Sequence, residues 1–472
     1  MKVALIHYHL RTGGVTRVIS NQSAALTALG IDHLILSAGP APANVPHRRI
    51  EELDYQISPD RISNSLFHLL LAACERHFGG PPDLWHLHNP TLGKSTHFPA
   101  LVKDLAESQT PLILQPHDFA EDNRPSNYPR LTGDDLYPVA PQIHYAFINS
   151  RDQGLLENAG LPPTNSHLLP NAVVGEGLPK DSANSPSENL VLYPVRGIRR
   201  KNLGEVVLLA ALAPAGTRFA VSLAPENEVW QDVHDHWEQF SQQRNLPVDF
   251  NVTDRIPPVE GAGADYQTWL EHASHLLTTS VAEGFGLAFL EPILKGKPLL
   301  GRDLPEITDD FHQEGIQPGR LYQNIPIPLS ALDLPTLRRL LRERLLESYQ
   351  QYGQSFHDDQ LEEAWQTLTE GDSVDFGKLP EPFQEEIIQQ ALAGKADYLD
   401  DLRIWLMETL AETEPTARPE QLGSYSLQRS QADLEALYQT ASSAPAGPPS
   451  WLNKEEVLKQ YLSPTRFHFL RS

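Results

Sequence analysis

The sequence is dominated by an alternation of short aliphatic runs and longer helical patterns, which occurs twice along the chain. In the first part, runs such as Val3–Ile6 and Leu84–Leu87 alternate with helical patterns such as Val15–Leu29 and Phe98–Ala106. This alternation is typical of parallel strands joined by crossover helices. A second series begins at Leu190–Val195. We therefore predict an α/β fold with two open, Rossmann-like sheets in tandem.

The two series are separated by residues 174–188, where Gly, Pro and Ser replace almost all large apolar residues. Such a composition is typical of a linker. From Leu329 onward we predict no further strand, because long and strongly acidic helical patterns take over. The predicted parts are an N-terminal Rossmann-like domain, a C-terminal Rossmann-like domain, an acidic helical elaboration, and a last helix with a tail. Their bounds are 1–178, 179–330, 331–425 and 426–472.

The composition excludes several classes of protein. The 472 residues carry a formal net charge of −24, so nucleic-acid binding through bulk positive charge is not expected. The only cysteine, Cys74, excludes an internal disulfide and a cysteine-ligated metal site, and suits a reducing compartment. No aliphatic stretch approaches the roughly 18 residues of a membrane span, and the start of the chain lacks a signal-peptide pattern. We expect a cytoplasmic protein without a transmembrane segment; peripheral membrane contact is disfavoured but left open.

The most informative segment is Thr278–Leu300, where an apolar strand ends just before Glu283 and a helix carrying Glu291 follows. A helix N-terminus behind glycines offers backbone N–H groups and a positive dipole end to a phosphate. Glu291 could accept hydrogen bonds from a ribose, and Glu283 could face a sugar beside the phosphate. The alternative is a tight turn with two surface glutamates. The turn itself consists of Gly284, Phe285, Gly286 and Leu287.

A basic segment precedes it, at Leu192–Glu205, where a strand ends at Arg196 and a helix follows Lys201. Ligands of open α/β domains bind at the carboxyl ends of strands, and four cations within six positions would neutralise a diphosphate leaving group. We choose Arg196 and Lys201 as the functional pair. A solvated basic loop is the alternative, although it is out of character in this acidic half. Because the chain has no Asp-x-Asp motif, we expect no essential metal and no other cofactor.

The first half offers weaker candidates. Gly13 and Gly14 lie between the first strand and the first helix, where backbone could approach a ligand closely, although most such pairs are only turns. His117 and Asp118 follow another strand, where an imidazole can hydrogen-bond a sugar hydroxyl, although a lone histidine is more often structural. The two histidines of the WHLHN segment (85–89) share one strand face without a third ligand at metal spacing, so we predict no zinc site.

Together these residues resemble the retaining glycosyltransferases of the GT-B fold, specifically family four. The family's Glu-x7-Glu motif reads here as Glu283-GFGLAFL-Glu291. The resemblance covers about residues 1–310 and a helix near Gln428–Tyr438. Pro292 departs from the family pattern, which usually has a small residue there. The other matching positions, in chain order, are Gly13-Gly14, His117, Phe147 to Ser150, Pro170-Asn171, Arg196 and Lys201.

The resemblance implies two Rossmann-like domains facing across a cleft, with a nucleotide-diphosphate sugar on the second. It implies that Arg196 and Lys201 bind the diphosphate, that Glu291 binds the ribose, and that Glu283 lies near the donor sugar. The backbone of the turn that ends at Leu287 would complete the phosphate cradle. Gly13 and Gly14 would face the acceptor, with His117 near the transferred sugar, and the helix near residues 428–438 would return toward the first domain. The residues assigned to catalysis are Glu283, His117, Arg196 and Lys201.

The resemblance also implies that transfer keeps the anomeric configuration through same-face attack, without a side-chain nucleophile. We expect a metal-independent hexosyltransferase acting on a small soluble acceptor, with glucose or mannose as the sugar common in the family. The alternatives are a GT-B epimerase or phosphorylase, or a catalytically silent GT-B module that serves as a binding partner. The nucleotide base, the acceptor, the oligomeric state and the role of residues 331–425 are left open.

Overall fold

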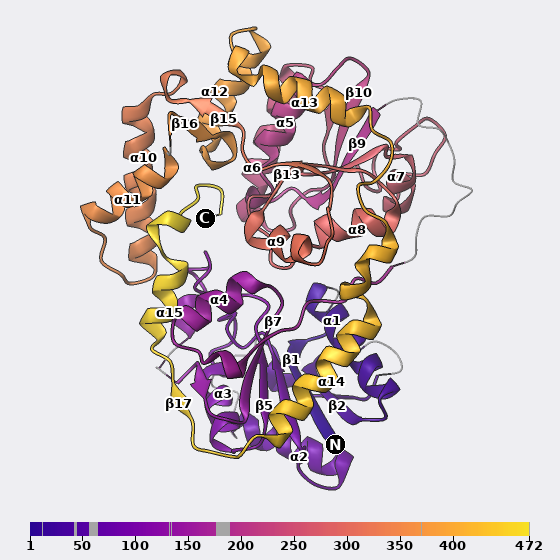
Figure 1. Ribbon diagram of the computed structural model, residues 1–472, viewed down its shortest axis with the longest axis vertical. Coiled ribbons are helices and arrows are strands. Elements are labelled where there is room, and N and C mark those ends of the chain that lie inside the picture. The colour runs from indigo at the N-terminus through magenta and orange to yellow at the C-terminus, as the bar shows by residue number, and fades with distance from the viewer. Residues whose placement is uncertain are drawn as a thin grey trace. The chain divides into compact units, whose positions relative to one another are not determined.

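The chain divides into two compact units, which are described separately (Figure 1). Unit 1 comprises 1–174, 348–355 and 423–463, and unit 2 comprises 175–347, 356–422 and 464–472. Residues 176–188 of the predicted linker (174–188), and with them the predicted boundary at 178, lie outside the described residues. The computed structural model describes residues 1–11, 13–41, 45–55, 65–131, 133, 135–175, 189–369 and 371–471.

Unit 1 is built on a seven-stranded sheet with the order β3-β2-β1-β4-β5-β7-β8, in which all neighbours are parallel. The predicted alternation of strands and crossover helices is confirmed. Strands β1, β4 and β5 end at the same edge of the sheet, where the predicted first-half candidates lie. The strand bounds are β1 Lys2–His9, β2 Asp32–Ala38, β3 His47–Arg49, β4 Leu84–His88, β5 Leu112–Gln115, β7 Ile143–Phe147 and β8 Ser166–Leu168.

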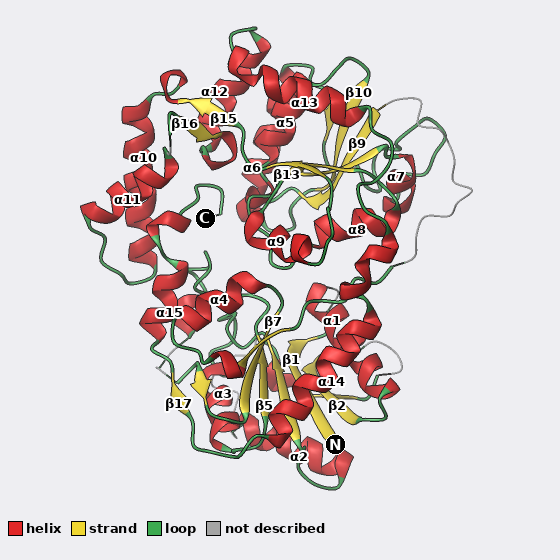
Figure 2. Cartoon of the chain, in the orientation of Figure 1, coloured by secondary structure: helices red, strands yellow, loops and turns green. Residues whose placement is uncertain are grey.

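Helices cover both faces of the unit 1 sheet (Figure 2). One face packs on α1 and α14, as the shared cluster of Val3, Ile19 and Leu434 shows. The other face packs on α2, α3, α4 and α15, which contribute Leu70 and Val457 among others. Burial of both faces explains why the central strands β1, β4, β5 and β7 are largely apolar. The helix bounds are α1 Gly14–Ala28, α2 Leu66–Phe78, α3 Phe98–Glu107, α4 Ser150–Asn158, α14 Leu427–Ser443 and α15 Lys454–Tyr461.

Unit 2 repeats this plan with a six-stranded parallel sheet of order β11-β10-β9-β12-β13-β14. Strands β9, β12 and β13 are neighbours, so the loops after them meet at one edge. The strand bounds are β9 Asn189–Arg196, β10 Thr217–Leu223, β11 Val248–Asp249, β12 His275–Thr278, β13 Leu299–Arg302 and β14 Arg320–Tyr322. The helix bounds are α5 Leu203–Leu212, α6 Gln231–Gln243, α7 Tyr266–His272, α8 Leu287–Lys295 and α9 Pro305–Gln313.

Beyond residue 329 the predicted helices are present, but the prediction that strands stop there is wrong. Strand β16 (Ser373–Asp375) pairs antiparallel with β15 (Pro326–Pro328), and β17 (Ser450–Trp451) pairs with β6 (Pro138–Val139). Strands of two or three residues are too short to leave a periodic pattern in the sequence. No described helix combines the length and apolar character that crossing a membrane requires. The helices are α10 Leu334–Gln351, α11 Asp358–Leu368, α12 Glu381–Leu392 and α13 Asp400–Leu410.

A buried ion network holds the carboxyl edge of the unit 2 sheet together. The Arg302 guanidinium at the end of β13 lies between Glu205 in the first turn of α5 and Asp375 of β16. Its Nη2 donates to Glu205 Oε2 at 2.6 Å, and its Nη1 donates to Asp375 Oδ2 at 2.7 Å. Tyr322 Oη donates to Glu205 at 2.8 Å, and the Ile325 amide donates to Asp375 at 2.8 Å. Because the Arg302 side chain is only 5% exposed, the network is paired almost entirely within the protein.

We expect Arg302→Met to lower the free energy of unfolding by about 3–5 kcal/mol, because it leaves two buried carboxylates without a counter-charge. Urea unfolding followed by tryptophan fluorescence measures this change. The control is Arg339→Met, which removes an exposed pair with Glu343 at 2.8 Å and should cost about 0.5 kcal/mol or less. Equal effects of the two substitutions would contradict the role assigned to the buried network.

Candidate functional site

The basic segment forms a tight loop between β9 and α5. After β9 ends at Arg196, a single turn of 3-10 helix covers Arg199–Lys201, and Asn202 adopts the left-handed conformation at a φ of 51°. The side chain of Asn202 donates through Nδ2 to Glu205 Oε2 at 2.7 Å, and its Oδ1 accepts from Gln384 Nε2 of α12 at 2.9 Å. The turn is therefore anchored directly to the buried ion network.

The loop that follows β12 is fastened to this basic loop. Thr279 Oγ1 donates to the Lys201 carbonyl at 2.8 Å, and the Val281 amide donates to the Arg200 carbonyl at 2.9 Å. Buried Tyr193 of β9 lies 2.8 Å from Ser280 Oγ through its hydroxyl. These bonds fix the backbone on which Lys201 and the first glutamate of the predicted motif stand.

Glu283 is the acidic centre of this arrangement. Its carboxylate forms an ion pair with Lys201 Nζ, and its other oxygen lies 3.2 Å from Arg200 Nη1. Arg200 Nη1 also donates to the Ala282 carbonyl at 2.5 Å. The Lys201 and Glu283 side chains are only 10% and 11% exposed, so the pair is shielded from bulk water while Arg200 remains 39% exposed.

The surroundings keep Glu283 ionised. Burial by itself raises the pKa of its carboxyl, but the charges of Lys201 and Arg200 outweigh burial, and hydrogen bonds from Lys201 and Ser280 add to their effect. The pKa of Glu283 is thereby lowered to about 2. At neutral pH the group is a fixed anion between two cations, and it is suited to hold a ligand rather than to transfer a proton.

The glycine turn leads into α8 as predicted. Gly286 has a φ of 88°, and a Cβ on it would lie 2.7 Å from Ile307 Cγ2, so both conformation and packing require glycine. Helix α8 begins at Leu287, and its N-cap residue, Gly286, contributes no side-chain hydrogen bond. Glu291 follows one turn later, and its charge together with burial raises the pKa of Tyr266 to about 12. Burial is the larger of the two causes. Pro292 lies inside α8.

The other two arginines of the basic segment, of which only Arg196 was predicted as a site residue, have other partners. Arg196 Nη2 lies 2.8 Å from Glu226, and its side chain is 47% exposed. Arg199 forms a bidentate ion pair with Glu381 of α12. Its Nε and Nη2 donate to the two carboxylate oxygens at 2.6 and 2.9 Å. The structure thus brings Arg200, and not Arg196, to Glu283. The predicted basic segment includes Arg200, but the sequence offered no reason to choose this residue. The turn that orients its side chain is too short to leave a periodic pattern.

In unit 1, His117 and Asp118 stand on the loop that follows β5. Asn89, which is left-handed with a φ of 57°, accepts from the His117 and Asp118 amides at 3.3 and 3.0 Å. Asp118 forms an ion pair with Arg124. Tyr352, from the end of α10, accepts from the Arg124 amide at 2.8 Å and donates to a backbone carbonyl at 2.9 Å. Tyr352 therefore fastens this loop through two hydrogen bonds. The sequence did not indicate this contact.

The paired glycines of unit 1 lie at the start of α1. Gly13 is extended, with a φ of 168°, and Gly14 is the first helical residue. A Cβ on Gly13 would lie 3.8 Å from the Arg11 carbonyl, and a Cβ on Gly14 would meet no atom within 4 Å. Neither backbone strain nor packing within the described residues accounts for glycine at these two positions.

One group of side chains could hold a metal ion, judged by the proximity of its atoms in the part of the chain that the structure describes. It consists of His234, Asp235 and Glu238 on α6, whose ligand atoms lie within 4.8 Å of one another. His234 Nδ1 is already 3.2 Å from Asp235 Oδ1, which is the geometry of a hydrogen bond. None of these residues was predicted as a functional residue.

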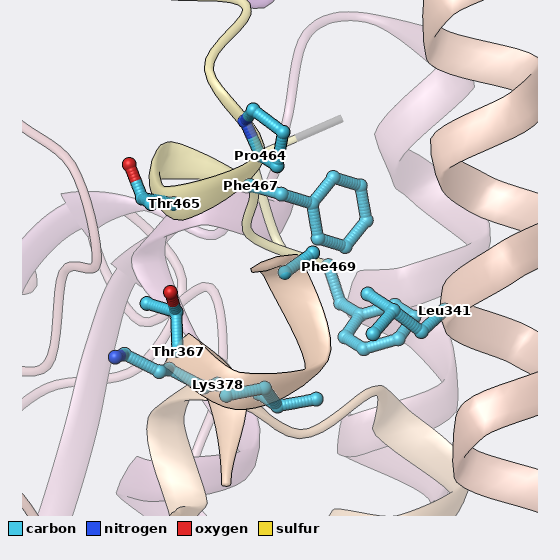
Figure 3. A pocket seen from close by; sticks show the side chains of 9 residues that line it. Leu341, Thr367, Lys378, Pro464, Thr465, Phe467 and Phe469 are labelled. Carbon is cyan, nitrogen blue, oxygen red and sulfur yellow. The ribbon is translucent and has the colours of Figure 1, made fainter. Parts of the chain in front are cut away.

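A pocket of unit 2 is lined by the segment after α15 and by α10 and α11 (Figure 3). Phe467 and Phe469 lie beside Leu341, while the oxygens of Thr367 and Thr465 and the Lys378 nitrogen lie toward the opposite side. It contains none of the predicted site residues. The full lining is Leu341, Ala364, Thr367, Leu368, Lys378, Pro464, Thr465, Phe467 and Phe469.

Comparisons with known proteins agree on the fold. No protein-family model matches the chain. The chain is 25% identical over 430 residues to mannosylglucosyl-3-phosphoglycerate synthase of Petrotoga mobilis, which covers 83% of this chain and 82% of the relative. It resembles the structure of sucrose-phosphate synthase from Thermosynechococcus elongatus with a TM-score of 0.51 and 15% identity over 93% of this chain and 98% of that chain. Anabaena HepE in complex with UDP and glucose gives a TM-score of 0.52 and 13% identity over 93% and 100% of the two chains.

These solved structures are GT-B glycosyltransferases. The two parallel sheets of this chain match their two Rossmann-like domains, so the chain has the GT-B fold. The predicted fold class is confirmed.

The lowered pKa of Glu283 makes a prediction about acid stability. A carboxyl whose pKa is depressed by folding stabilises the folded state above its ordinary pKa of 4.5, and that stabilisation is lost as the pH falls toward 2. We expect wild type to be more stable than Glu283→Gln at pH 7, by on the order of 3 kcal/mol. The difference should shrink between about pH 4.5 and pH 2.

Urea unfolding at pH 7, 4 and 3 measures this difference. The matched control is Glu343→Gln, which alters the exposed pair with Arg339. A stability difference between wild type and Glu283→Gln that stays constant over this range would show that Glu283 is not held ionised by its neighbours.

Proposed function

We propose that the chain is a glycosyltransferase that takes its sugar from a nucleotide-diphosphate sugar. One observation carries the proposal: Glu283 is held as a buried anion by Lys201 and Arg200 at the carboxyl edge of the unit 2 sheet, directly before the glycine turn that leads into the N-terminus of α8. Open α/β sheets bind ligands at this edge. The GT-B fold and the relative from Petrotoga mobilis, a synthase of a mannosylglucosyl compound, support the same chemistry.

The donor diphosphate would bind between the basic loop and the start of α8. Lys201, Arg200 and Glu283 together carry one net positive charge, and α8 adds the positive end of its dipole. Departure of a nucleoside diphosphate builds negative charge on the leaving phosphate, which fixed cations and N–H groups stabilise. We propose that these groups do the work for which other transferases use a metal, with Arg196 as a further contact after it leaves Glu226.

Glu283 and Glu291 would hold the sugar side and the ribose side of the donor. A fixed carboxylate accepts hydrogen bonds from sugar hydroxyls, and Glu283 has the lowered pKa that keeps it an acceptor. Glu291 lies one helical turn after the phosphate cradle, within α8. The resemblance to the retaining GT-B family supports the further proposal that transfer keeps the anomeric configuration through same-face attack, which needs no side-chain nucleophile.

The acceptor would bind to unit 1, at the loops that follow β1 and β5. Gly13 and Gly14 leave room for a ligand beside the backbone, and the loop of His117 and Asp118 is held rigidly by Asn89 and Tyr352. The curated relative makes a mannosylglucosyl-3-phosphoglycerate, which fits a small soluble acceptor. We propose transfer of a hexose, glucose or mannose, to such an acceptor in the cytoplasm.

A thermal-shift panel tests the donor chemistry first. UDP, GDP, ADP and dTDP are compared with and without magnesium, because a ligand of the native state raises the melting temperature by mass action. We expect one diphosphate to stabilise the protein equally well without metal. If no diphosphate raises the melting temperature at millimolar concentration, the chain is better described as a GT-B module without catalytic activity.

Replacing the ion pair should abolish transfer in a folded protein. We expect Lys201→Met and Glu283→Gln each to lower kcat by about 10²–10³-fold, because each removes charge from the leaving-phosphate and sugar positions. The rate of sugar transfer and the melting temperature are measured together. The control, Arg338→Met, breaks a surface ion pair with Glu362 in the same unit and should transfer at the wild-type rate. Wild-type turnover in either site variant would refute the assignment.

The choice between the two arginines can be tested separately. Because Arg200 forms an ion pair with Glu283 whereas Arg196 forms one with Glu226, we expect Arg200→Met to weaken diphosphate binding about tenfold. Arg196→Met should weaken it less in the absence of sugar. Calorimetric titration with the stabilising diphosphate measures both affinities. The reverse order would support the pair chosen from the sequence.

A further inference from the structure

Three histidines of unit 1 form a stack at the carboxyl ends of β4 and β5. The rings of His86 and His88 are 4.4 Å apart between centroids with planes at 20°, and those of His88 and His117 are 5.5 Å apart at 14°. His88 Nδ1 lies 3.2 Å from His117 Nε2, which is a hydrogen bond. The sequence pointed to His117 alone and gave no reason to join it to His88.

Both members of this hydrogen bond are neutral. Burial lowers the pKa of His88 well below its usual value, and the charges of His86 and His117 would lower it further. Burial also lowers the pKa of His117 to about 4, against a smaller opposing effect of Asp118. When two neutral imidazoles form a hydrogen bond, only one proton lies between the two nitrogens. One ring therefore donates and the other accepts.

The environment of His88 decides which ring donates. Its other nitrogen, Nε2, is buried and has no hydrogen-bond partner. The stacked ring offers no acceptor, because His86 Nε2 lies 3.0 Å from Gln115 Oε1 and His86 Nδ1 lies 2.7 Å from Tyr438 Oη. A buried N–H without an acceptor is less favourable than a bare lone pair. The His88 proton therefore belongs on Nδ1, where it is donated to His117 Nε2.

This assignment leaves His117 with its own proton on Nδ1. Within the described chain, Nδ1 makes no hydrogen bond, and the residue keeps 7% of its surface exposed. We propose that His88 is a positioning residue that fixes His117 in the Nδ1–H tautomer, so that His117 meets its ligand as a hydrogen-bond donor. The tautomer follows from unit 1 alone, whereas the identity of the ligand as a sugar hydroxyl rests on the proposed function.

The chemical consequence is that His117 cannot accept the proton of an attacking hydroxyl. Its only lone pair, on Nε2, is occupied by His88, and its Nδ1–H can only donate to an oxygen. His117 would hold a sugar hydroxyl, or an oxygen that gains negative charge, in a fixed orientation. The backbone supports this, because the His117 amide is held by Asn89 Oδ1 at 3.3 Å.

Long-range ¹H–¹⁵N correlation spectra of the full-length protein labelled in its histidines read the tautomer directly, without any sugar nucleotide. His117→Gln removes the signals of that ring and so assigns them. We expect the ligand-free wild type to carry the His117 proton on Nδ1 at pH 7. A His117 proton on Nε2 would overturn the proposal.

Substitutions at His88 add a functional readout. His88→Asn keeps an N–H donor near the position of Nδ1, and His88→Leu removes it. We expect His88→Asn to preserve the His117 tautomer, and His88→Leu to lose it and to lower kcat about tenfold or more with a KM change of about threefold or less. An unchanged tautomer in His88→Leu would overturn the proposal. If His88→Leu fails to fold, the wild-type spectrum still decides the assignment.

A second histidine pair of unit 1 supplies the matched control. His144 Nδ1 lies 2.8 Å from His167 Nε2, on β7 and β8. His167→Leu removes a similar bond and should change neither the tautomer of His117 nor kcat; loss of both in this variant would show that His88 acts only through general stability. If wild type transfers no sugar, the proposed function fails, while the spectrum still tests the tautomer.

Discussion

The buried pairing of Arg302 with Glu205 and Asp375 is the constraint on which unit 2 depends. Three charges that are almost fully removed from water remain stable only while every partner stays in place. The network joins the end of β13, the first turn of α5 and the short strand β16, which belong to distant parts of the sequence. Asn202 connects this network to the loop between β9 and α5, because its side chain donates a hydrogen bond to Glu205.

This constraint explains how a basic loop can be held rigid in an acidic chain. Exposed arginines usually sample many conformations, and their ion pairs contribute little. Here Arg199 is held by Glu381, and Asn202 by Gln384, both from α12. The backbone of Arg200 and Lys201 is bonded to the loop after β12. The two cations are thereby positioned in the ligand-free protein, and under the proposed function this would lower the cost of reorganisation during catalysis.

The fold could be predicted from the sequence because it rests on local periodicity. Runs such as Val3–Ile6 and the glycine turn at Gly286 carry their structure in a few neighbouring residues. The contacts of the candidate site rest on long-range geometry instead. The choice of Arg200 over Arg196 depends on a single turn of helix, and the part played by Tyr352 depends on how α10 returns to the loop after β5. Such contacts join residues separated by many positions, so no spacing pattern reveals them.

The two units bring different electrostatics to their sheet edges, and the difference follows from how each treats burial. Unit 2 buries a carboxylate together with cations, so Glu283 stays charged. Unit 1 buries imidazoles together with neutral groups such as Gln115 and Tyr438, so His88 and His117 stay uncharged. A carboxylate held among cations suits a diphosphate, and uncharged imidazoles that donate an N–H suit hydroxyl groups. Sugar transfer needs both surfaces, because its donor carries the charge and its acceptor carries the hydroxyl.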